Sequence, residues 1–279
     1  MKEALNYIIS RLRESLDADE ARALAWWVLE EVSGLSRSQL LSDCKGTTNI
    51  SDTQIFEPII DRLLRFEPIQ YIFGHTLWYG LDLKVTPATL IPRPETAELV
   101  EKISNFQFPI SNCRVLDVGT GSGCIALAIK QQHPDWQVTG IDISVEAIEV
   151  ARENARRNGL DVAFEQQDVF SDEPSAVNSC HYDIVVSNPP YIRECEKAAM
   201  SSNVLDYEPA TALFVPDNDP LLFYRRVAAF YKAKFLFFEI NEALGNEMVA
   251  MLKENGYTDI QIHLDSYGKQ RIVTARMDR

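Results

Sequence analysis

Beyond Cys113 the chain alternates apolar runs of strand length with segments of helical periodicity. This alternation restricts the fold more than any other feature of the sequence. The expected strands are 114–118, 137–141, 162–166, 183–187, 234–240, 259–264 and 271–275, with helices over 122–132 and 144–157 between the first three. Because a strand, a helix and a further strand in succession build a parallel sheet with right-handed crossovers, we expect an α/β fold with a mostly parallel, seven-stranded, Rossmann-like sheet.

The first third of the chain has a different pattern. Apolar residues recur at helical spacing from Ala21 to Val32, after an acidic start and before Gly34. From residue 70 to residue 90, aromatic and aliphatic residues are interrupted by Gly74 and Gly80, as in a β-hairpin. We therefore expect a helical bundle over 1–68 that docks a substrate, a β-hairpin and linker over 69–92, and the α/β domain over 93–279.

The charge and residue composition argue against several classes of protein. Acidic residues number 41 against 27 basic ones, so the net charge of −14 provides no broad cationic surface for free nucleic acid. The five cysteines form no C-x-x-C pair, and the four scattered histidines have no metal-ligand spacing, so we expect reduced thiols and no metal. The chain starts without a signal-peptide pattern and lacks an apolar run of membrane-spanning length; we expect a cytoplasmic protein without membrane contact.

A glycine-rich turn follows the first strand of the α/β domain. Asp117 lies in the strand, and the turn reads Gly119-Thr120-Gly121-Ser122-Gly123 before a helix. Glycines allow a ligand to approach the backbone closely at the start of a helix. The dinucleotide fingerprint G-x-G-x-x-G requires a glycine at the position of Cys124, so a nicotinamide or flavin cofactor is disfavoured.

Two carboxylates follow the next strands. Asp142 is placed to accept hydrogen bonds from two ribose hydroxyls, although it also fits as a cap for the helix that begins near Ser144. Asp168 is placed to accept from an exocyclic amine, with Val169 or Phe170 beside a purine ring. Because no lysine follows the glycines to hold a triphosphate, a ligand with a ribose and a base but no phosphate fits best. S-adenosylmethionine meets that description.

The tetrapeptide Asn188-Pro189-Pro190-Tyr191 follows a buried strand directly. Two prolines hold the backbone out of helix and sheet, so the Asn188 and Pro189 oxygens stay available as acceptors. A planar NH2 group is then able to donate one hydrogen to the Asn188 side chain and one to the Pro189 carbonyl, while Tyr191 packs against its face. A proline-terminated strand end without a ligand is the alternative interpretation.

Together these motifs resemble a known family. The glycine turn, Asp142, Asp168 and the tetrapeptide are similar to class I S-adenosylmethionine-dependent methyltransferases that act on a planar amino nitrogen. The string Leu90-Ile91-Pro92-Arg93-Pro94-Glu95-Thr96, with the helical first third and the hairpin, resembles the PrmC (HemK) family. Enzymes of that family methylate the side-chain amide nitrogen N5 of a glutamine, in a Gly-Gly-Gln loop, of peptide-chain release factors.

The resemblance implies roles for individual residues. The implied cofactor set is Asp117, Gly119, Thr120, Gly121, Ser122, Gly123, Asp142, Asp168, Val169, Phe170 and Asn188, and S-adenosylhomocysteine is the product. Asn188, Pro189 and Tyr191 are the implied catalytic residues, acting by positioning, and the implied substrate contacts are Asn188, Pro189, Pro190, Tyr191, Arg93 and Glu95. Arg93 and Glu95 fit a linker ion pair equally well. The family often has an aromatic residue where Val169 stands, which favours Asp168 or Phe170 beside the adenine.

Three alternatives remain open at this stage. A glutamine methyltransferase of a ribosomal protein would share every motif. An amino-methyltransferase of adenine or cytosine would use the same tetrapeptide on a flipped base, against which the acidic charge argues. A binding module that kept the fold without catalysis would not need both motifs intact. We expect a monomer whose protein partner is a release factor.

Overall fold

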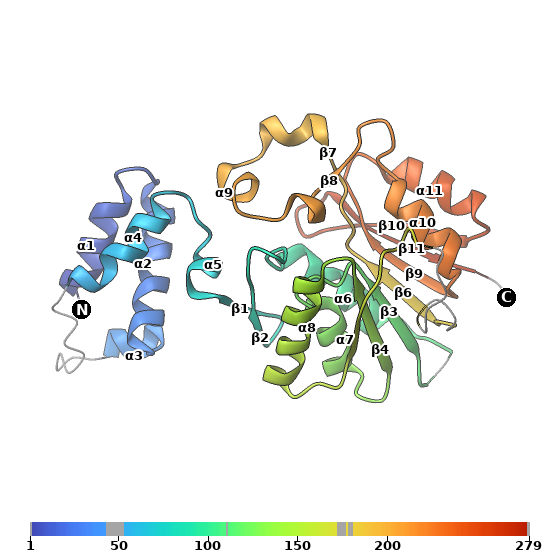
Figure 1. The fold of residues 1–279 in the computed structure, drawn as a ribbon, viewed down its shortest axis with the longest axis horizontal. Helices are drawn as coiled ribbons and strands as arrows, with labels where there is room; N and C mark the ends of the chain where they lie inside the picture. Colours follow the sequence, from blue (N-terminus) through green and yellow to red (C-terminus); the bar gives the residue numbers. More distant parts are fainter. Residues whose placement is uncertain (1, 43–52, 110, 172–176, 178–180, 278–279) are drawn as a thin grey trace. The chain divides into compact units, whose positions relative to one another are not determined.

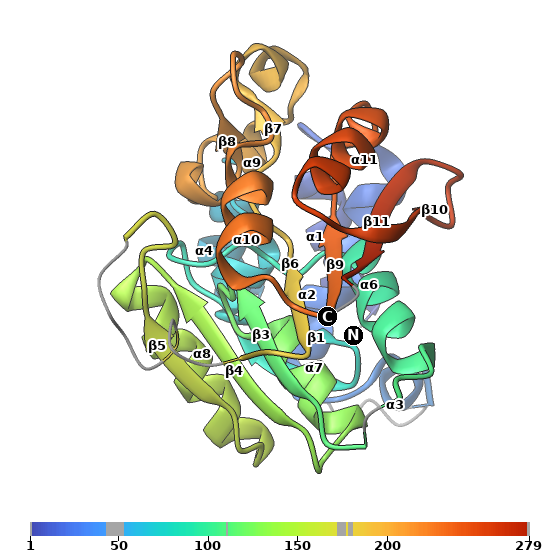
Figure 2. The same ribbon diagram turned by 90° about the vertical axis from the view of Figure 1, so that its right-hand side faces the viewer.

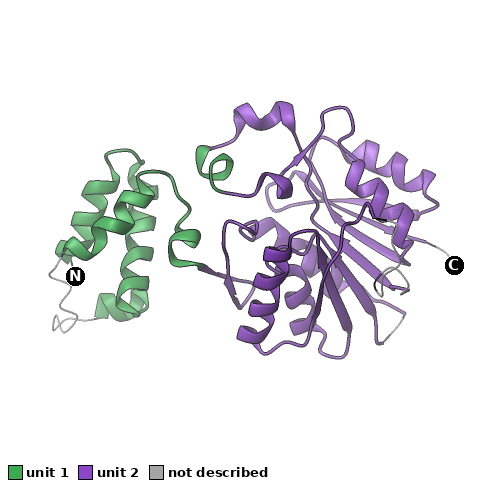
Figure 3. Cartoon of the chain, in the orientation of Figure 1, with its two compact units in different colours: residues 1–74, 202–207 green, residues 75–201, 208–279 purple. Residues whose placement is uncertain are grey.

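A computed structural model describes residues 2–42, 53–109, 111–171, 177 and 181–277. The chain divides into two compact units (Figure 3). Unit 1 comprises Met1–Gly74 with Ser202–Tyr207, and unit 2 comprises His75–Ser201 with Glu208–Arg279. The first unit is helical and the second contains the sheet.

Unit 1 is built from short helices around an aliphatic core. Its elements are α1 (Lys2–Leu12), α2 (Ala18–Ser33), α3 (Arg37–Ser42), the 3-10 helix η1 (Thr53–Phe56), α4 (Glu57–Leu63), α5 (Ile69–Phe73) and α9 (Ser202–Leu205). The predicted helix before Gly34 is confirmed as α2, which begins at Asp17, whose carboxylate accepts from Asp19 N and Glu20 N, and ends at Gly34 in the left-handed conformation. Ile8, Leu29 and Ile60 are fully buried between these helices.

The hairpin is shorter than its sequence pattern suggested. Residues 69–73, which the predicted hairpin and linker over 69–92 included, belong instead to α5, which follows Pro68 and ends at Gly74 with φ 75°. The strands are β1 (His75–Trp78) and β2 (Leu81–Lys84). The prediction failed there because Tyr71 and Phe73 alternate at the two-residue spacing of a strand, and a helix of five residues is too short to show a helical period.

The sheet of unit 2 has seven strands in the order β10-β11-β9-β6-β3-β4-β5 (Figures 1 and 2). They are β3 (Arg114–Val118), β4 (Gln137–Asp142), β5 (Ala163–Gln166), β6 (Ile184–Ser187), β9 (Phe235–Glu239), β10 (Thr258–Leu264) and β11 (Gln270–Arg276). The pairs among β5, β4, β3, β6 and β9 are parallel, and β11 runs antiparallel to both of its neighbours. The predicted mostly parallel α/β sheet is confirmed.

Helices cover both faces of the sheet, and the sheet lies between two hydrophobic clusters. The helices of unit 2 are α6 (Pro94–Asn105), α7 (Cys124–Gln132), α8 (Val145–Asn158), α10 (Leu222–Tyr231) and α11 (Gly245–Glu254). Residues of α6, α7, α8 and the hairpin pack on one face, against Val115 and Phe237. Residues of α10 and α11 pack on the other, against Leu116 and Phe238. Buried strands of this kind are apolar on both sides, which explains their unbroken apolar runs in the sequence.

A long connection between β6 and α10 carries the remaining short elements. They are β7 (Ile192–Arg193), the 3-10 helix η2 (Glu194–Ala199), α9 of unit 1, the 3-10 helix η3 (Ala210–Ala212) and β8 (Phe214–Val215), which pairs with β7. Among the helices of the described residues, none has both the length and the apolar character needed to cross a bilayer.

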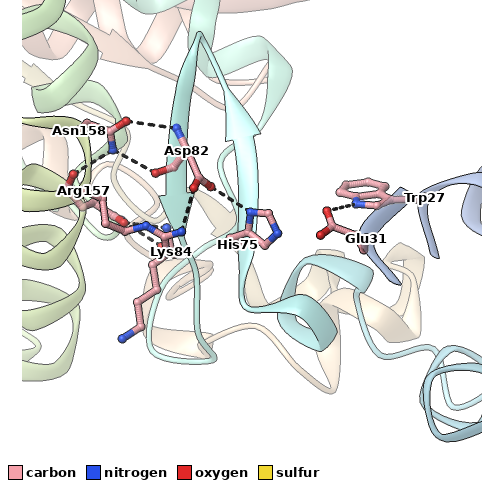
Figure 4. Close-up of polar contacts among 8 residues, drawn as sticks. Trp27, Glu31, His75, Asp82, Lys84, Arg157 and Asn158 are labelled. Carbon is pink, nitrogen blue, oxygen red and sulfur yellow. Dashed lines mark hydrogen bonds and ion pairs between the residues drawn. The ribbon is translucent and has the colours of Figure 1, made fainter. Parts of the chain in front are cut away.

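Side chains of α8 attach the hairpin by hydrogen bonds to the backbone of β2, in the way that a neighbouring strand would (Figure 4). Asn158 accepts from Asp82 N and donates to Asp82 O, while Asn154 does the same with the backbone of Lys84. Arg157 adds an ion pair of 2.8 Å with the Asp82 carboxylate. Because Asn154 also donates to Ser122 O, the hairpin and the glycine turn are fixed to the same helix.

Candidate active site

The glycine turn and the tetrapeptide leave the sheet from neighbouring strand ends. Val118, the last residue of β3, pairs in parallel register with Ser187, the last residue of β6. The Ser187 hydroxyl donates to Val118 O at 2.6 Å and links the two ends. Gly119 and Asn188 therefore start side by side at the carboxyl edge, where open α/β sheets bind ligands.

The turn has an open backbone. Gly119, Gly121 and Gly123 have φ values of 72°, 55° and 82°, a region that residues with a Cβ rarely adopt. A Cβ built on Gly119 or Gly121 meets no atom within 4 Å, so the space above both residues is free, whereas one on Gly123 would lie 3.0 Å from the Phe164 ring. The turn thus has the open surface that close approach of a ligand requires.

Asp142 is bound to this turn. Its Oδ2 accepts from Gly121 N at 2.9 Å and its Oδ1 from Ser144 N at 3.0 Å. The N-cap of α8 is Ser144, whose hydroxyl accepts from Ala147 N, so capping does not account for Asp142. Burial raises the pKa of Asp142, and the backbone donors of Ser144 and Gly121 oppose that shift.

Asp117 lies beneath the turn and is fully buried. Its Oδ2 accepts from the Thr120 hydroxyl at 2.6 Å and from Ala126 N at 3.2 Å. Its Oδ1 has no hydrogen-bond partner among the described residues. Burial raises the pKa of this carboxyl to about 7, although both hydrogen bonds lower it.

The segment after β5 carries the residues predicted to flank the base. Asp168 is exposed, and its Oδ1 accepts from Phe170 N at 2.8 Å. Val169 packs against the apolar cluster of α10 and α11, and Phe170, 41% exposed, lies with its ring centroid 5.3 Å from that of Phe223. Of these residues, Phe170 offers the exposed apolar surface that could flank a base.

The tetrapeptide is connected to residues from distant parts of the chain. Asn188 Nδ2 donates to the Thr96 hydroxyl at 3.2 Å, and the Tyr191 hydroxyl donates to Glu239 Oε1 at 3.0 Å. Thr96 also donates to Glu239 Oε2 at 2.7 Å. Within the described part of the chain, neither Asn188 Oδ1 nor the Pro189 carbonyl accepts a hydrogen bond. Both acceptors proposed for an NH2 group are therefore unused.

Arg93 and Glu95 are not paired with each other. Arg93 forms an ion pair of 2.5 Å with Glu208, whose side chain is 1% exposed. Glu208 also accepts from Ile91 N at 3.2 Å. The linker is thus held by a residue from the connection between β6 and α10. Glu208 thus balances the charge of Arg93. Burial raises the pKa of Glu239, and the nearby negative charge of Glu95 adds a smaller effect in the same direction.

Several residues of the site were not identified from the sequence. They are Ile143, Asn154, Glu208 and Glu239, and Thr96 was quoted in a motif without a role. Glu239 did have a signal, because it is the single charged residue at the end of the apolar run Phe235–Glu239. Ile143 follows Asp142 and is 58% exposed, so it supplies apolar surface beside the glycine turn. Glu208 had no comparable local pattern.

Two family models match the chain. The model described as the PrmC N-terminal domain matches residues 3–74, and the one described as a methyltransferase domain matches residues 110–262. The release factor glutamine methyltransferase of Bacteroides thetaiotaomicron is 42% identical, with 99% of each chain covered. The enzyme of the same name from Flavobacterium psychrophilum is 39% identical, with 98% of each chain covered. The chain belongs to the PrmC family of release factor glutamine methyltransferases.

Solved structures agree with this family's fold. A methyltransferase from Pyrococcus furiosus superposes with a TM-score of 0.51 at 18% identity, covering 80% of this chain and all of that one. The hMettl16 catalytic domain, solved in complex with the MAT2A 3'UTR hairpin 1, gives a TM-score of 0.55 at 17% identity and covers 71% of this chain and 75% of that one. At such identities the likeness establishes the class I methyltransferase fold alone, in agreement with the predicted fold class.

Proposed function

We propose that this PrmC-family enzyme transfers a methyl group from S-adenosylmethionine to the side-chain amide nitrogen of a glutamine in a peptide-chain release factor. The names of its relatives support the substrate, and the methyltransferase domain supports the donor. No specific observation favours a ribosomal protein or a nucleic-acid base as the acceptor. The net charge of −14 continues to disfavour the base.

The observation that carries the proposal is the pairing of Val118 with Ser187. Neighbouring strands lie about 4.8 Å apart. A donor bound over the turn that starts at Gly119 and an acceptor bound at Asn188 would therefore meet at one edge of the sheet. Methyl transfer requires this proximity. Holding the two reactants in the right orientation lowers the activation barrier by roughly 7–11 kcal/mol in favourable cases.

The residues at the turn fit S-adenosylmethionine. The open space over Gly119 and Gly121 would accept its methionine part, and the orphaned Oδ1 of Asp117 offers an acceptor beneath that part. Asp142 would hold the ribose hydroxyls, and Ile143 and Phe170 offer exposed apolar surface for the base. When bound, this cofactor supplies an electrophilic methyl group on a positively charged sulfur.

The residues of the tetrapeptide position the nucleophile. A carboxamide nitrogen reacts poorly because its lone pair is delocalised into the carbonyl group. Asn188 Oδ1 and the Pro189 carbonyl would accept both amide hydrogens, weaken that delocalisation and aim the nitrogen. Tyr191 would pack against the plane of the amide. The nitrogen becomes acidic only after it has been methylated, so no acid–base pair is needed to remove its proton first.

Docking of the protein substrate is assigned to residues 1–68, with Arg93 and Glu95 near the incoming loop. In this proposal the enzyme acts as a monomer in the cytoplasm. Binding outside the reacting loop predicts that a short Gly-Gly-Gln peptide has a much higher KM than the intact release factor, because it lacks the remote contacts. Equal KM values for the peptide and the protein would remove the docking role.

The decisive experiment measures labelled methyl transfer from S-adenosylmethionine to a purified release factor. We expect one methyl group per protein, on the glutamine of the Gly-Gly-Gln loop. A release factor with that glutamine replaced by asparagine is the matched control and should remain unlabelled. Label in the control, or label appearing on ribosomal protein or nucleic acid instead, would contradict the proposed substrate.

A further inference from the structure

Glu239 is a buried carboxylate at the centre of the acceptor side of the site. It is 1% exposed and ends β9, where the preceding residue Phe238 pairs with Ser187 of β6. Glu239 is therefore the counterpart of Asn188 on the neighbouring strand. Burial raises the pKa of Glu239, while the hydrogen bonds from Thr96 and Tyr191 and the nearby charge of Arg271 lower it. A buried carboxylate is costly unless donors surround it, so its surroundings require explanation.

The direction of each hydrogen bond around Glu239 follows from counting donors. The hydroxyl donors Thr96 and Tyr191 and the charge of Arg271 favour the ionised form of Glu239. An ionised carboxylate only accepts, and a threonine hydroxyl has a single hydrogen. Because the Thr96 hydrogen goes to Glu239 Oε2 at 2.7 Å, the Thr96 oxygen is left as an acceptor towards Asn188 at 3.2 Å. Only the NH2 group of Asn188 is able to donate there. The orientation of a carboxamide is otherwise ambiguous, and here the network decides it.

We infer that Thr96, held by Glu239, is a positioning residue that fixes the Asn188 carboxamide with its NH2 group turned inward and its Oδ1 presented to the substrate. This inference rests on the proposed transfer to an amide nitrogen, because only an acceptor at Oδ1 suits a donating NH2 group. With the opposite orientation, Asn188 would present two hydrogens to a group that also has two hydrogens. The substrate amide would then lose one of its two acceptors.

Variants at Thr96 test the inference. Thr96→Val has nearly the same shape and neither donates nor accepts, so the Asn188 carboxamide loses its inward partner. We expect kcat to fall about 100-fold, as misplacement of a reacting group does. The KM for the release factor and the Kd for S-adenosylmethionine should stay within about threefold of wild type, because remote contacts provide most of the binding. Thr96→Ser keeps the hydroxyl and should recover kcat to within about fivefold of wild type.

Tyr224→Phe is the matched control. The Tyr224 hydroxyl is buried and donates to Glu239 O at 2.8 Å, so its removal disturbs the same strand end without touching the bond from Thr96 to Asn188. We expect its kcat to remain within about threefold of wild type while its thermal stability falls by the loss of one buried hydrogen bond. Thr96→Ala provides a second deletion of the hydroxyl, without the β-branch, if Thr96→Val does not fold.

The outcomes separate this inference from the proposed function. Wild-type enzyme that transfers no methyl group to the release factor refutes the function, and the inference with it. Active wild type together with a Thr96→Val or Thr96→Ala variant of unchanged kcat refutes the inference alone. Equal losses of kcat in Thr96→Val and Tyr224→Phe, or no recovery in Thr96→Ser, show a general packing role and also overturn it.

Discussion

In the proposed function, the carboxyl edge of the sheet has a cofactor half and an acceptor half, which are built in different ways. The cofactor half, formed by Asp117, the glycine turn and Asp142, takes its polar groups from two successive strands and bonds them mainly to nearby backbone. The acceptor half joins Asn188, Thr96 and Glu239 across sequence separations of 92 and 143 residues. The first half is assembled by local geometry, and the second depends on the completed fold.

This difference has a chemical reason. A cofactor used in every turnover binds to backbone groups and one or two carboxylates, which a short turn can supply. A weak nucleophile has to be oriented, and orientation requires side chains that are themselves held by buried partners. The acceptor half should therefore respond to substitution in kcat, and the cofactor half in binding of the cofactor.

The largest expected effect is in the acceptor half. Asn188→Ala removes the side-chain acceptor for the substrate amide, and we expect kcat to fall about 100- to 1000-fold, as for loss of a positioned group at a reacting centre. Cofactor affinity and thermal stability should change little, because Asn188 is only partly buried and its Oδ1 bonds no described residue. Single-turnover methylation and calorimetric titration measure the two quantities. If Asn188→Ala kept its turnover, the expectation that the acceptor half responds in kcat would be wrong.

The corresponding substitution in the cofactor half should change cofactor affinity instead of kcat. Asp142→Asn replaces a carboxylate oxygen by an NH2 group, which faces either Gly121 N or Ser144 N as a second donor. We expect the Kd for S-adenosylmethionine to rise about 10- to 100-fold, in line with hydrogen bonds to charged groups, and kcat at saturating cofactor to stay within about threefold. Asp135→Asn is the control, because Asp135 is exposed before the opposite end of β4 and should leave the affinity unchanged. Comparable losses in both variants would contradict the assignment of Asp142.

The sequence predicted the two halves unequally. Asp117, the glycines, Asp142 and Asn188 were proposed because each lies at or near the end of an apolar run, and strand ends can be located from local patterns. Glu208 and the partners of Asn188 were not, because a hydrogen bond between α6 and β9 depends on how helices pack on the sheet. The hairpin shows the same limit at short range. The predicted hairpin and linker over 69–92 included residues 70–73, although Gly74 ends a helix there.

A smaller effect concerns the ion pair that ties the linker to the acceptor half. Arg93→Met removes the partner of Glu208, whose side chain is 1% exposed, and leaves a buried carboxylate bonded only to Ile91 N. We expect the free energy of unfolding to fall by about 1–3 kcal/mol, measured by urea denaturation. Glu95→Gln, the control in the same linker, should change it by less than about 0.5 kcal/mol.

A double-mutant cycle with Glu208→Gln completes that test. If Arg93 acts through Glu208, the two substitutions together should cost clearly less than the sum of their separate costs. Additive losses would mean that Arg93 stabilises the fold through a partner other than Glu208. The acceptor half would then have one long-range connection fewer than the structure indicates.

The smallest expected effect is the pH dependence contributed by the cofactor half through Asp117. Burial raises the pKa of this carboxyl from 3.8 to about 7, so between those values the folded state holds a proton that the unfolded state has released. In that window the free energy of unfolding therefore falls by about 1.4 kcal/mol for each pH unit of increase, and above pH 7 this contribution is constant.

Asp117→Asn removes the titrating group while keeping an acceptor for the Thr120 hydroxyl and Ala126 N. We measure the free energy of unfolding of the cofactor-free enzyme by urea denaturation at pH 6 and pH 8. Between these values it should fall by about 1 kcal/mol more in wild type than in the variant. A positively charged cofactor beside Asp117 favours the ionised carboxylate, so saturating S-adenosylmethionine should flatten the difference. Identical pH profiles for both proteins would show that Asp117 is ionised throughout, and the orphaned Oδ1 would then need a donor from outside the chain.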